Sequence, residues 1–195
     1  MLSKGEAKMV PNFLTRYHTA NVDPFVSLND YPHEKANEIK LSHCQRNNIG
    51  GYYAQDEYLL HRKRVEKWIY SQLIKRGGNP KCNVPVYMAL GESPKGKFDI
   101  RHDIQKDAIE LQIPVSYLDM KAVTFTYPDS LIKFTFNKHG DRVNAQLTNE
   151  PSVYLYHELE ELIRKRQVYN EPYEHYIEAQ VWDREMLYAF LRSRS

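Results

Sequence analysis

Apolar and polar residues alternate in three short runs between residues 121 and 148. The apolar members at alternate positions are Val123, Phe125 and Tyr127, then Ile132, Phe134 and Phe136, and finally Val143, Ala145 and Leu147. A period of two predicts strands with one buried face, and the segments 128–130 and 138–141 between the runs carry residues typical of turns. The region is therefore predicted to form a central three-strand antiparallel meander that helices cover on one face.

A helical period governs residues 56–76. The residues that repeat along one stripe are Tyr58, Arg62, Val65, Ile69 and Leu73. Asp56 and Glu57 at the start of this segment suit the positive end of a helix dipole, and Gly77-Gly78 at its end supplies a left-handed stop. The pattern predicts a long helix with one face packed against the rest of the protein.

The remaining elements are shorter. Helices are predicted from Asp30 onward, from Ser152 to Arg166 and after Asp183, and strands at 13–19, 84–90, 109–115 and 175–182. Because helices and strands mix without a regular βαβ alternation, the predicted fold class is α+β, with a mostly antiparallel sheet and flanking helices. No linker divides the chain, so we expect a single domain, 1–195, with residues 1–10 as a loose N-terminal segment.

Composition agrees with a globular protein, since 42% of the residues are hydrophobic and 27% are charged. No run of roughly 18 apolar residues is present, and the first residues lack the apolar core of a secretory signal. We therefore expect no membrane association and a cytoplasmic location. The two cysteines, Cys44 and Cys82, have neither metal-binding nor redox spacing.

Missing motifs exclude several classes of function, whereas the overall charge gives no indication of nucleic-acid binding and leaves a local basic patch open. The 27 basic and 25 acidic side chains give a net charge of +2, which lacks the basic excess usual in nucleic-acid-binding domains. Phosphate-binding loops, dinucleotide fingerprints and hydrolase motifs are missing from the sequence. The eight histidines have no ligand spacing, so no metal is expected. The run His61–Arg64 is interpreted as a solvated helix face, because four successive helical residues point around the axis.

The last predicted strand has an unusual polar face. With a period of two, its residues divide into an apolar set, Ile177, Ala179 and Val181, and an opposite set, Tyr176, Glu178, Gln180 and Trp182. A carboxylate, an amide and two aromatic rings on one face suit a cleft for a planar polar ligand, with the carboxylate as a general base. The same pattern also fits a solvent-facing strand with aromatic cross-strand pairs.

Two short segments and the coarse order of elements carry a resemblance to a known family. Residues 16–19 (Arg-Tyr-His-Thr) lie in an early strand, and residues 178–180 (Glu-Ala-Gln) lie in a late one. In these features the chain resembles the ADP-ribosyltransferase fold, and most of all its DNA-targeting toxin branch. The resemblance implies NAD as cofactor, Glu178 as the catalytic carboxylate, and Arg16 or His18 as the residue that holds the dinucleotide. It also implies cofactor contacts from Gln180 and, through a loop covering the nicotinamide, from Arg46 and Tyr52.

The chain departs from the family pattern at two places. The family's Glu-x-Glu or Gln-x-Glu pair stands here in reverse order, as Glu178-Ala179-Gln180. A middle-strand Ser-Thr-Ser is missing, and Thr124 and Thr126 stand in its place. The stretch 125–130 also resembles bacterial and phage proteins, which adds no chemistry.

Two functions from different classes follow from these patterns. The first is an NAD-dependent enzyme that transfers ADP-ribose to a macromolecular target, nucleic acid or protein. The second is a non-catalytic binding module, in which Tyr and Trp side chains, with Trp182 as an anchor, form a surface that recognises a protein or a single-stranded nucleic acid; the chain has 15 tyrosines. A structural or oligomerisation role is a third reading that the sequence leaves open.

Overall fold

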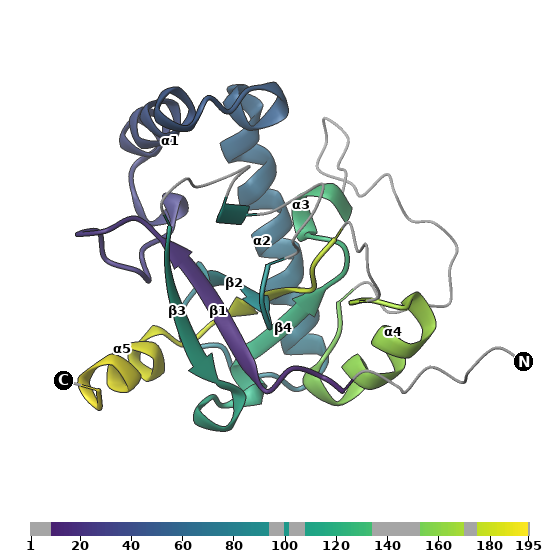
Figure 1. Cartoon of the computed structure of the whole chain (residues 1–195). Coiled ribbons are helices and arrows are strands. Elements are labelled where there is room, and N and C mark those ends of the chain that lie inside the picture. Colours follow the sequence, from purple (N-terminus) through teal and green to yellow (C-terminus); the bar gives the residue numbers. More distant parts are fainter. Residues whose placement is uncertain (1–8, 94–99, 102–107, 134–152, 170–174, 195) are drawn as a thin grey trace, which may run out of the picture.

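Five antiparallel strands and flanking helices make up the protein, which confirms the α+β class (Figure 1). The computed structural model describes residues 9–93, 100–101, 108–133, 153–169 and 175–194, with only the backbone of Tyr52, Ile132 and Lys133. The strands are β1 (Phe13–His18), β2 (Val86–Leu90), β3 (Ile109–Pro114), β4 (Val123–Thr126) and β5 (Glu178–Val181). They form one sheet in the order β3-β1-β2-β5-β4, so that the last strand of the chain lies between β2 and β4.

The register of the sheet decides which residues share a face. Glu178 of β5 lies opposite Ala89 of β2 on one side and Thr126 of β4 on the other. Ala89 in turn lies opposite Thr15 of β1. Because directly opposed residues point to the same side of a sheet, these residues share the face of Glu178, whereas their neighbours in sequence point to the other face.

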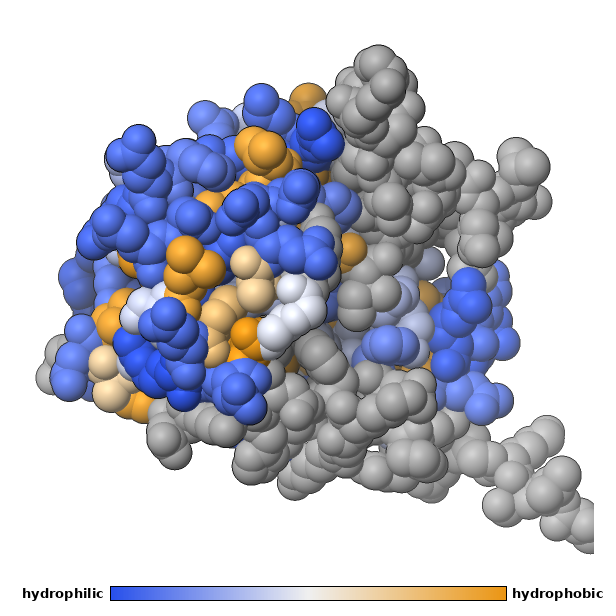
Figure 2. Space-filling view, turned by 90° about the horizontal axis from the view of Figure 1, so that it is seen from above, coloured by the Kyte–Doolittle hydropathy of each residue, from blue (hydrophilic) through white to orange (hydrophobic). Residues whose placement is uncertain are grey.

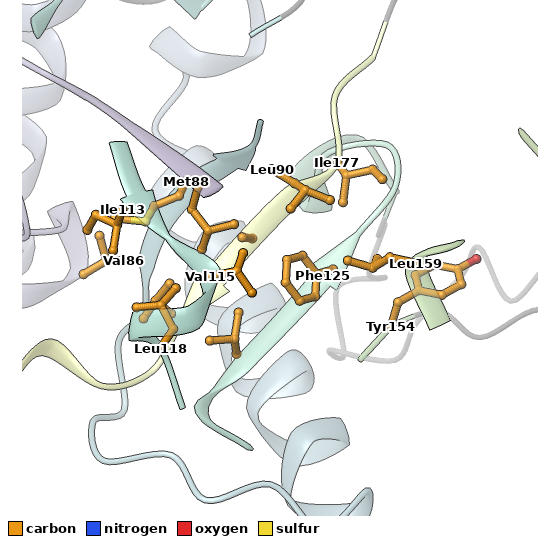
Figure 3. Packing of buried hydrophobic residues seen from close by; sticks show 14 of the residues in the cluster. Val86, Met88, Leu90, Ile113, Val115, Leu118, Phe125, Tyr154, Leu159 and Ile177 are labelled. Carbon is orange, nitrogen blue, oxygen red and sulfur yellow. The ribbon is translucent and has the colours of Figure 1, made fainter. Parts of the chain in front are cut away.

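The apolar face of the sheet carries the main core. Alternate residues of the strands pack there against the segment 115–118 and against α4 (Leu159–Arg166) and α5 (Arg184–Arg192). Buried members labelled in Figure 3 are Val86, Met88, Leu90, Ile113, Val115, Leu118, Phe125, Tyr154, Leu159 and Ile177. The predicted inward positions of the last strand, Ile177, Ala179 and Val181, all belong to this cluster. The period-two prediction for β5 is thereby confirmed.

The opposite face of the sheet lies against α2 (Glu57–Lys75), which runs behind the sheet in Figure 1. Val65, Ile69 and Leu73 of α2 form a second buried cluster together with Trp182, which is fully buried. The predicted helix 56–76 agrees closely with α2. Its end is fixed by Gly77 at a φ of +79° and by the amide of Gly78, which donates to the carbonyl of Leu73 at 2.9 Å.

The other helices are shorter or shifted relative to the sequence patterns. α1 (His33–Asn47) begins after Pro32, as expected for a helix opened near a proline. The helix predicted from 152 begins later, with a 3₁₀ turn at Tyr156–Glu158 before α4. The expected cap of α5 is confirmed, because the carboxylate of Asp183 accepts a hydrogen bond from the amide of Met186 at 3.2 Å.

The central meander is confirmed only at its first strand. β4 buries Val123 and Phe125 in the core and turns Thr124 and Thr126 to the other face, as the alternation predicts. The second predicted strand begins instead with a short helix, α3 (Ser130–Lys133), because Asp129 Oδ1 accepts the amide of Leu131 at 2.8 Å and favours a helical turn. The rest of the predicted meander, residues 134–148, lies outside the described residues.

The described surface is mainly hydrophilic when seen from above, with hydrophobic residues showing between the polar ones (Figure 2). Large exposed hydrophobic side chains include Leu41 of α1 and Leu60 of α2. Within the described ranges, none of the helices is both long enough and apolar enough to span a bilayer.

Candidate functional site

Glu178 is a buried carboxylate held through one of its two oxygens. It lies at the start of β5 with 5% of its surface exposed. Oε2 accepts hydrogen bonds from the amide of Ser130 at 2.9 Å, from the hydroxyl of Ser130 at 2.6 Å and from Gln180 Nε2 at 3.2 Å. Within the described part of the chain, Oε1 has no hydrogen-bond partner. The carboxylate is therefore oriented through Oε2, and no donor of the described residues occupies Oε1.

The turn after β4 supplies the group that orients this carboxylate. Ser130 is fully buried at the first residue of α3, and its amide and hydroxyl both point at β5. Thr126, the last residue of β4, accepts from Gln180 Nε2 at 3.0 Å. The contacts of Glu178 and Gln180 show that the polar face predicted for residues 176–182 is not exposed to solvent. It is a buried hydrogen-bonded layer between the sheet and its covering elements.

The surroundings of Glu178 favour its neutral form. Burial and the negative charge of Asp129 together raise the pKa of Glu178 from the ordinary 4.5 to about 7, against the opposing effects of the Ser130 hydrogen bonds and of Arg62. A carboxyl group with a pKa near neutrality can accept and return a proton under physiological conditions.

The raised pKa of Glu178 predicts a pH-dependent effect of Glu178→Gln on stability. Because the folded state holds this proton up to about pH 7 and the unfolded state loses it near 4.5, the stability contribution is present below pH 4.5 and lost as pH rises through 7. Glutamine keeps the oxygen that accepts from Ser130 and removes the charge. The variant should be more stable than the wild type by about 3 kcal/mol at pH 8, with little difference at pH 4.

Urea denaturation between pH 4 and pH 8 measures this difference. Glu160→Gln, at an exposed position of α4, is the matched control and should change stability equally little at both pH values. A constant difference between Glu178→Gln and the wild type across the range would contradict the assigned titration.

A second buried polar cluster lies beside the first, on α2, and the sequence interpretation missed it. Arg62 Nε donates to Glu66 Oε1 at 3.1 Å, and both side chains are largely buried, with 14% and 4% exposed. Tyr87 of β2 also donates to Glu66 Oε1 at 3.1 Å, and its ring lies under the Arg62 guanidinium at 4.3 Å from the centroid. The run His61–Arg64 is therefore not uniformly a solvated face, because Arg62 points inward and only Arg64 is exposed.

A sequence signal for Arg62 was present. Arg62 belongs to the stripe of α2 with Tyr58, and Arg62 Nη1 donates to the Tyr58 hydroxyl at 3.1 Å. A cation in an otherwise apolar stripe, four residues before a glutamate, indicates a buried pair. The run of residues 61–64 predicts a solvated face, but Arg62 alone among these four residues belongs to the stripe.

Arg16 and His18 do not lie with Glu178. Strand alternation turns both toward the other face of the sheet, since Thr15 between Leu14 and Arg16 shares the Glu178 face. Arg16 holds three backbone carbonyls, donating to Pro24 at 2.6 Å, to Tyr87 at 3.0 Å and to Val26 at 3.5 Å. Burial, with a smaller effect from Arg62, lowers the pKa of Arg16 to about 10, so it stays cationic at neutral pH.

Arg16 occupies the place where two strands separate. β1 pairs with β3 along its whole length, from Phe13 to His18, but with β2 only at Leu14 and Thr15. The guanidinium reaches across from β1 to the Tyr87 carbonyl beyond that point. His18, at the end of β1, is half-buried and its Nδ1 lies 3.0 Å from the Thr19 carbonyl. These contacts give Arg16 a bracing role between β1, β2 and the loop 24–26.

The remaining predicted cofactor residues are scattered. Gln180 lies next to Glu178 in the buried layer. Arg46 is exposed in the last turn of α1, so the predicted loop 46–53 begins as helix and contains a 3₁₀ turn at Gly51–Ala54. The side chain of Tyr52 lies outside the described residues. Among the predicted site residues whose side chains are described, only Glu178 and Gln180 lie together.

A metal site in the described residues would need one of the ligand sets that proteins use for metal ions. No group of three or more His, Cys, Asp or Glu side chains that could hold an ion occurs there. The described polar groups of the site are the titratable carboxyl group of Glu178, the hydroxyl of Ser130 and the amide of Gln180.

Comparison of the chain with family models, with curated proteins and with solved structures returns no match. The class that fold and site define is an α+β protein with a buried, oriented glutamate on an inner strand. The resemblance to ADP-ribosyltransferases stays a prediction.

Proposed function

We propose that the chain is an enzyme that transfers ADP-ribose from NAD to a macromolecular target, with Glu178 as its catalytic carboxylate. One observation carries the proposal. Glu178 is held by three donors through Oε2, while Oε1 has no partner in the described part of the chain. A preoriented carboxylate that keeps one oxygen for a ligand is what glycosyl transfer requires, because it can stabilise an oxocarbenium-like transition state.

The proposed step balances without an added oxidant or reductant. The bond between the ribose anomeric carbon of NAD and the nicotinamide nitrogen breaks, and its electron pair leaves with nicotinamide. An oxygen or nitrogen of the acceptor forms the new bond to that carbon, and its proton passes to Glu178 Oε1. The pKa of about 7 supports this use, because the carboxylate is then a base that is largely deprotonated just above neutral pH.

In this proposal Glu178 is the reacting group, and Ser130 and Gln180 orient it. Arg16 and His18 do not contact the dinucleotide in this proposal, because their strand positions face away from Glu178. Arg16 supports the site through the Tyr87 carbonyl of β2, the strand next to β5.

The alternative of a recognition surface built from Tyr and Trp has less support. Trp182, its proposed anchor, is fully buried and donates its indole N–H to Thr124 inside the protein. Tyr17, Tyr58 and Tyr154 are also buried. Aromatic anchors of a binding surface have to reach the partner, so no contact in the described residues favours this reading.

Nicotinamide release from NAD tests the proposed function. The protein is incubated with millimolar NAD, alone and with single-stranded DNA, duplex DNA or a protein mixture, and nicotinamide is quantified by chromatography. Release above the buffer control is expected, with the acceptor identified by mass spectrometry of the modified product. Absence of both NAD binding by calorimetry and nicotinamide release with every acceptor would refute the proposal.

A further inference from the structure

A chain of buried side-chain hydrogen bonds joins Trp182 to Glu178 across β4 and β5. Trp182 Nε1 donates to Thr124 Oγ1 at 2.9 Å, and Thr124 Oγ1 donates to Gln180 Oε1 at 2.9 Å. Gln180 Nε2 then donates to Glu178 Oε2 at 3.2 Å. Trp182, Thr124 and Gln180 are fully buried, so water does not compete with these bonds.

The indole group of Trp182 determines the direction of the other hydrogen bonds in this chain. An indole N–H can only donate, so Thr124 Oγ1 has to accept from Trp182. The single hydroxyl hydrogen of Thr124 is then directed to Gln180 Oε1. This bond identifies the oxygen end of the Gln180 amide, and the amide therefore presents its NH₂ group to Glu178.

The amide direction determines where Glu178 can carry a proton. Oε2 meets three donors, the amide and hydroxyl of Ser130 and the Nε2 of Gln180. An oxygen that accepts from three donors has no lone pair left for a proton. Oε1, which has no partner in the described residues, is the remaining position.

We propose that Trp182 and Thr124 are positioning residues that fix the amide of Gln180 and thereby confine the exchangeable proton of Glu178 to Oε1. The location of the proton is a property of the protein without any ligand. Its use in taking up the acceptor's proton rests on the proposed function. The chain of bonds thus links the tryptophan that packs against α2 to Oε2 of the carboxyl group and leaves Oε1 for the proton.

Other charged and titratable groups also face Glu178 and have to stay constant in a test. In the described residues these are Asp129 from the turn after β4, Tyr58 and Arg62 from α2, Tyr87 from β2, and Tyr176 just before β5. None of them belongs to the Trp182–Thr124–Gln180 chain. Variants within that chain therefore change the direction of the amide and leave the surrounding charges in place.

Removing either donor that fixes the amide should raise the pKa of Glu178. In Trp182→Phe and in Thr124→Val the amide of Gln180 can turn and offer its oxygen to Glu178 Oε2. That geometry stabilises only the protonated carboxyl group, since a carboxylate would face another acceptor. The midpoint of the Glu178 titration is expected to rise by about one pH unit or more, the size of one hydrogen bond to a charged group.

The titration is measured by ¹³C NMR on protein labelled at the glutamate carboxyl carbons, with the Glu178 signal assigned by its loss in Glu178→Gln. Two matched controls accompany the variants. Thr124→Ser keeps the hydroxyl, and Trp68→Phe replaces the other tryptophan, which packs half-buried beside the same cluster. Both controls should titrate like the wild type.

An unchanged Glu178 midpoint in folded Thr124→Val would overturn the proposal, as would an equal shift in Thr124→Ser. If Trp182→Phe does not fold, the two Thr124 variants decide the question. Unfolding of Thr124→Val as well would assign the chain of bonds a purely structural role and would also overturn it. The measurement contains no NAD, so its outcome is separate from the fate of the proposed activity.

Discussion

Glu178→Gln is expected to lower the rate of nicotinamide release from NAD by about 10²–10⁴-fold, the usual contribution of a general acid–base group. Glutamine preserves the shape of the side chain and its acceptor oxygen for Ser130, but it can neither take up a proton nor provide negative charge. In the wild type, the rate should rise with pH through about 7, because the carboxylate form of Glu178 is the reactive one. The variant should lose this rise. Initial rates between pH 5 and pH 9 measure both effects.

Two comparisons separate a catalytic role of Glu178 from a structural one. Glu160→Gln removes a carboxyl group at an exposed position and should leave rate and pH profile unchanged. The stability of Glu178→Gln should be higher than that of the wild type above pH 7, as argued from the raised pKa. Wild-type rates in a stably folded Glu178→Gln protein would remove Glu178 from the mechanism.

The sequence predicted those elements in which the apolar residues keep one spacing, helical or alternating, over the whole element. The stripe of α2 and the alternation in β5 each identify a buried face without knowledge of the partner element. Val65, Ile69 and Leu73 are buried as predicted, and so are Ile177, Ala179 and Val181. Local chemistry was sufficient as well at Asp183, whose carboxylate caps α5.

The sequence could not predict structure that depends on a distant partner. Ile132 fits the alternation of a strand, yet Ser130–Lys133 is helical. Ser130 makes its two bonds with Glu178, which lies 48 residues further along the chain. No pattern within a window of ten residues contains that pairing. The order of the strands, with β5 between β2 and β4, depends on long-range contacts in the same way.

The sequence predicted the part of the candidate site that depends on the local period of β5 and not the part that depends on distant elements. The period of β5 correctly put Glu178 and Gln180 on one face, and the structure joins them by a hydrogen bond. The sequence did not reveal that α2 covers this face, so Trp182 was assigned to a recognition surface and is instead buried. The resemblance that coupled Arg16 to Glu178 compared positions along the chain, whereas the sheet register places the two residues on opposite faces.

Arg62→Met is expected to destabilise the folded protein by about 3–5 kcal/mol, the cost of leaving a buried charge without its partner. Glu66 is 3% exposed and would keep only the bonds from Tyr87 and from Asn29, the latter at 2.6 Å. Arg64→Met, at an exposed position of the same helix, is the matched control and should change stability by less than about 0.5 kcal/mol. Urea denaturation at pH 7 measures both variants.

The double variant Arg62→Met/Glu66→Met tests whether the loss comes from the isolated charge. Methionine at both positions replaces the ion pair by apolar groups of similar length, which often costs little in a buried site. Part of the lost stability should therefore return, although Tyr87 and Asn29 lose their acceptor. A double variant less stable than Arg62→Met alone would show that Glu66 stabilises the fold through Tyr87 and Asn29 without needing Arg62. The second polar cluster would then be a hydrogen-bond network centred on Glu66 and not an ion pair.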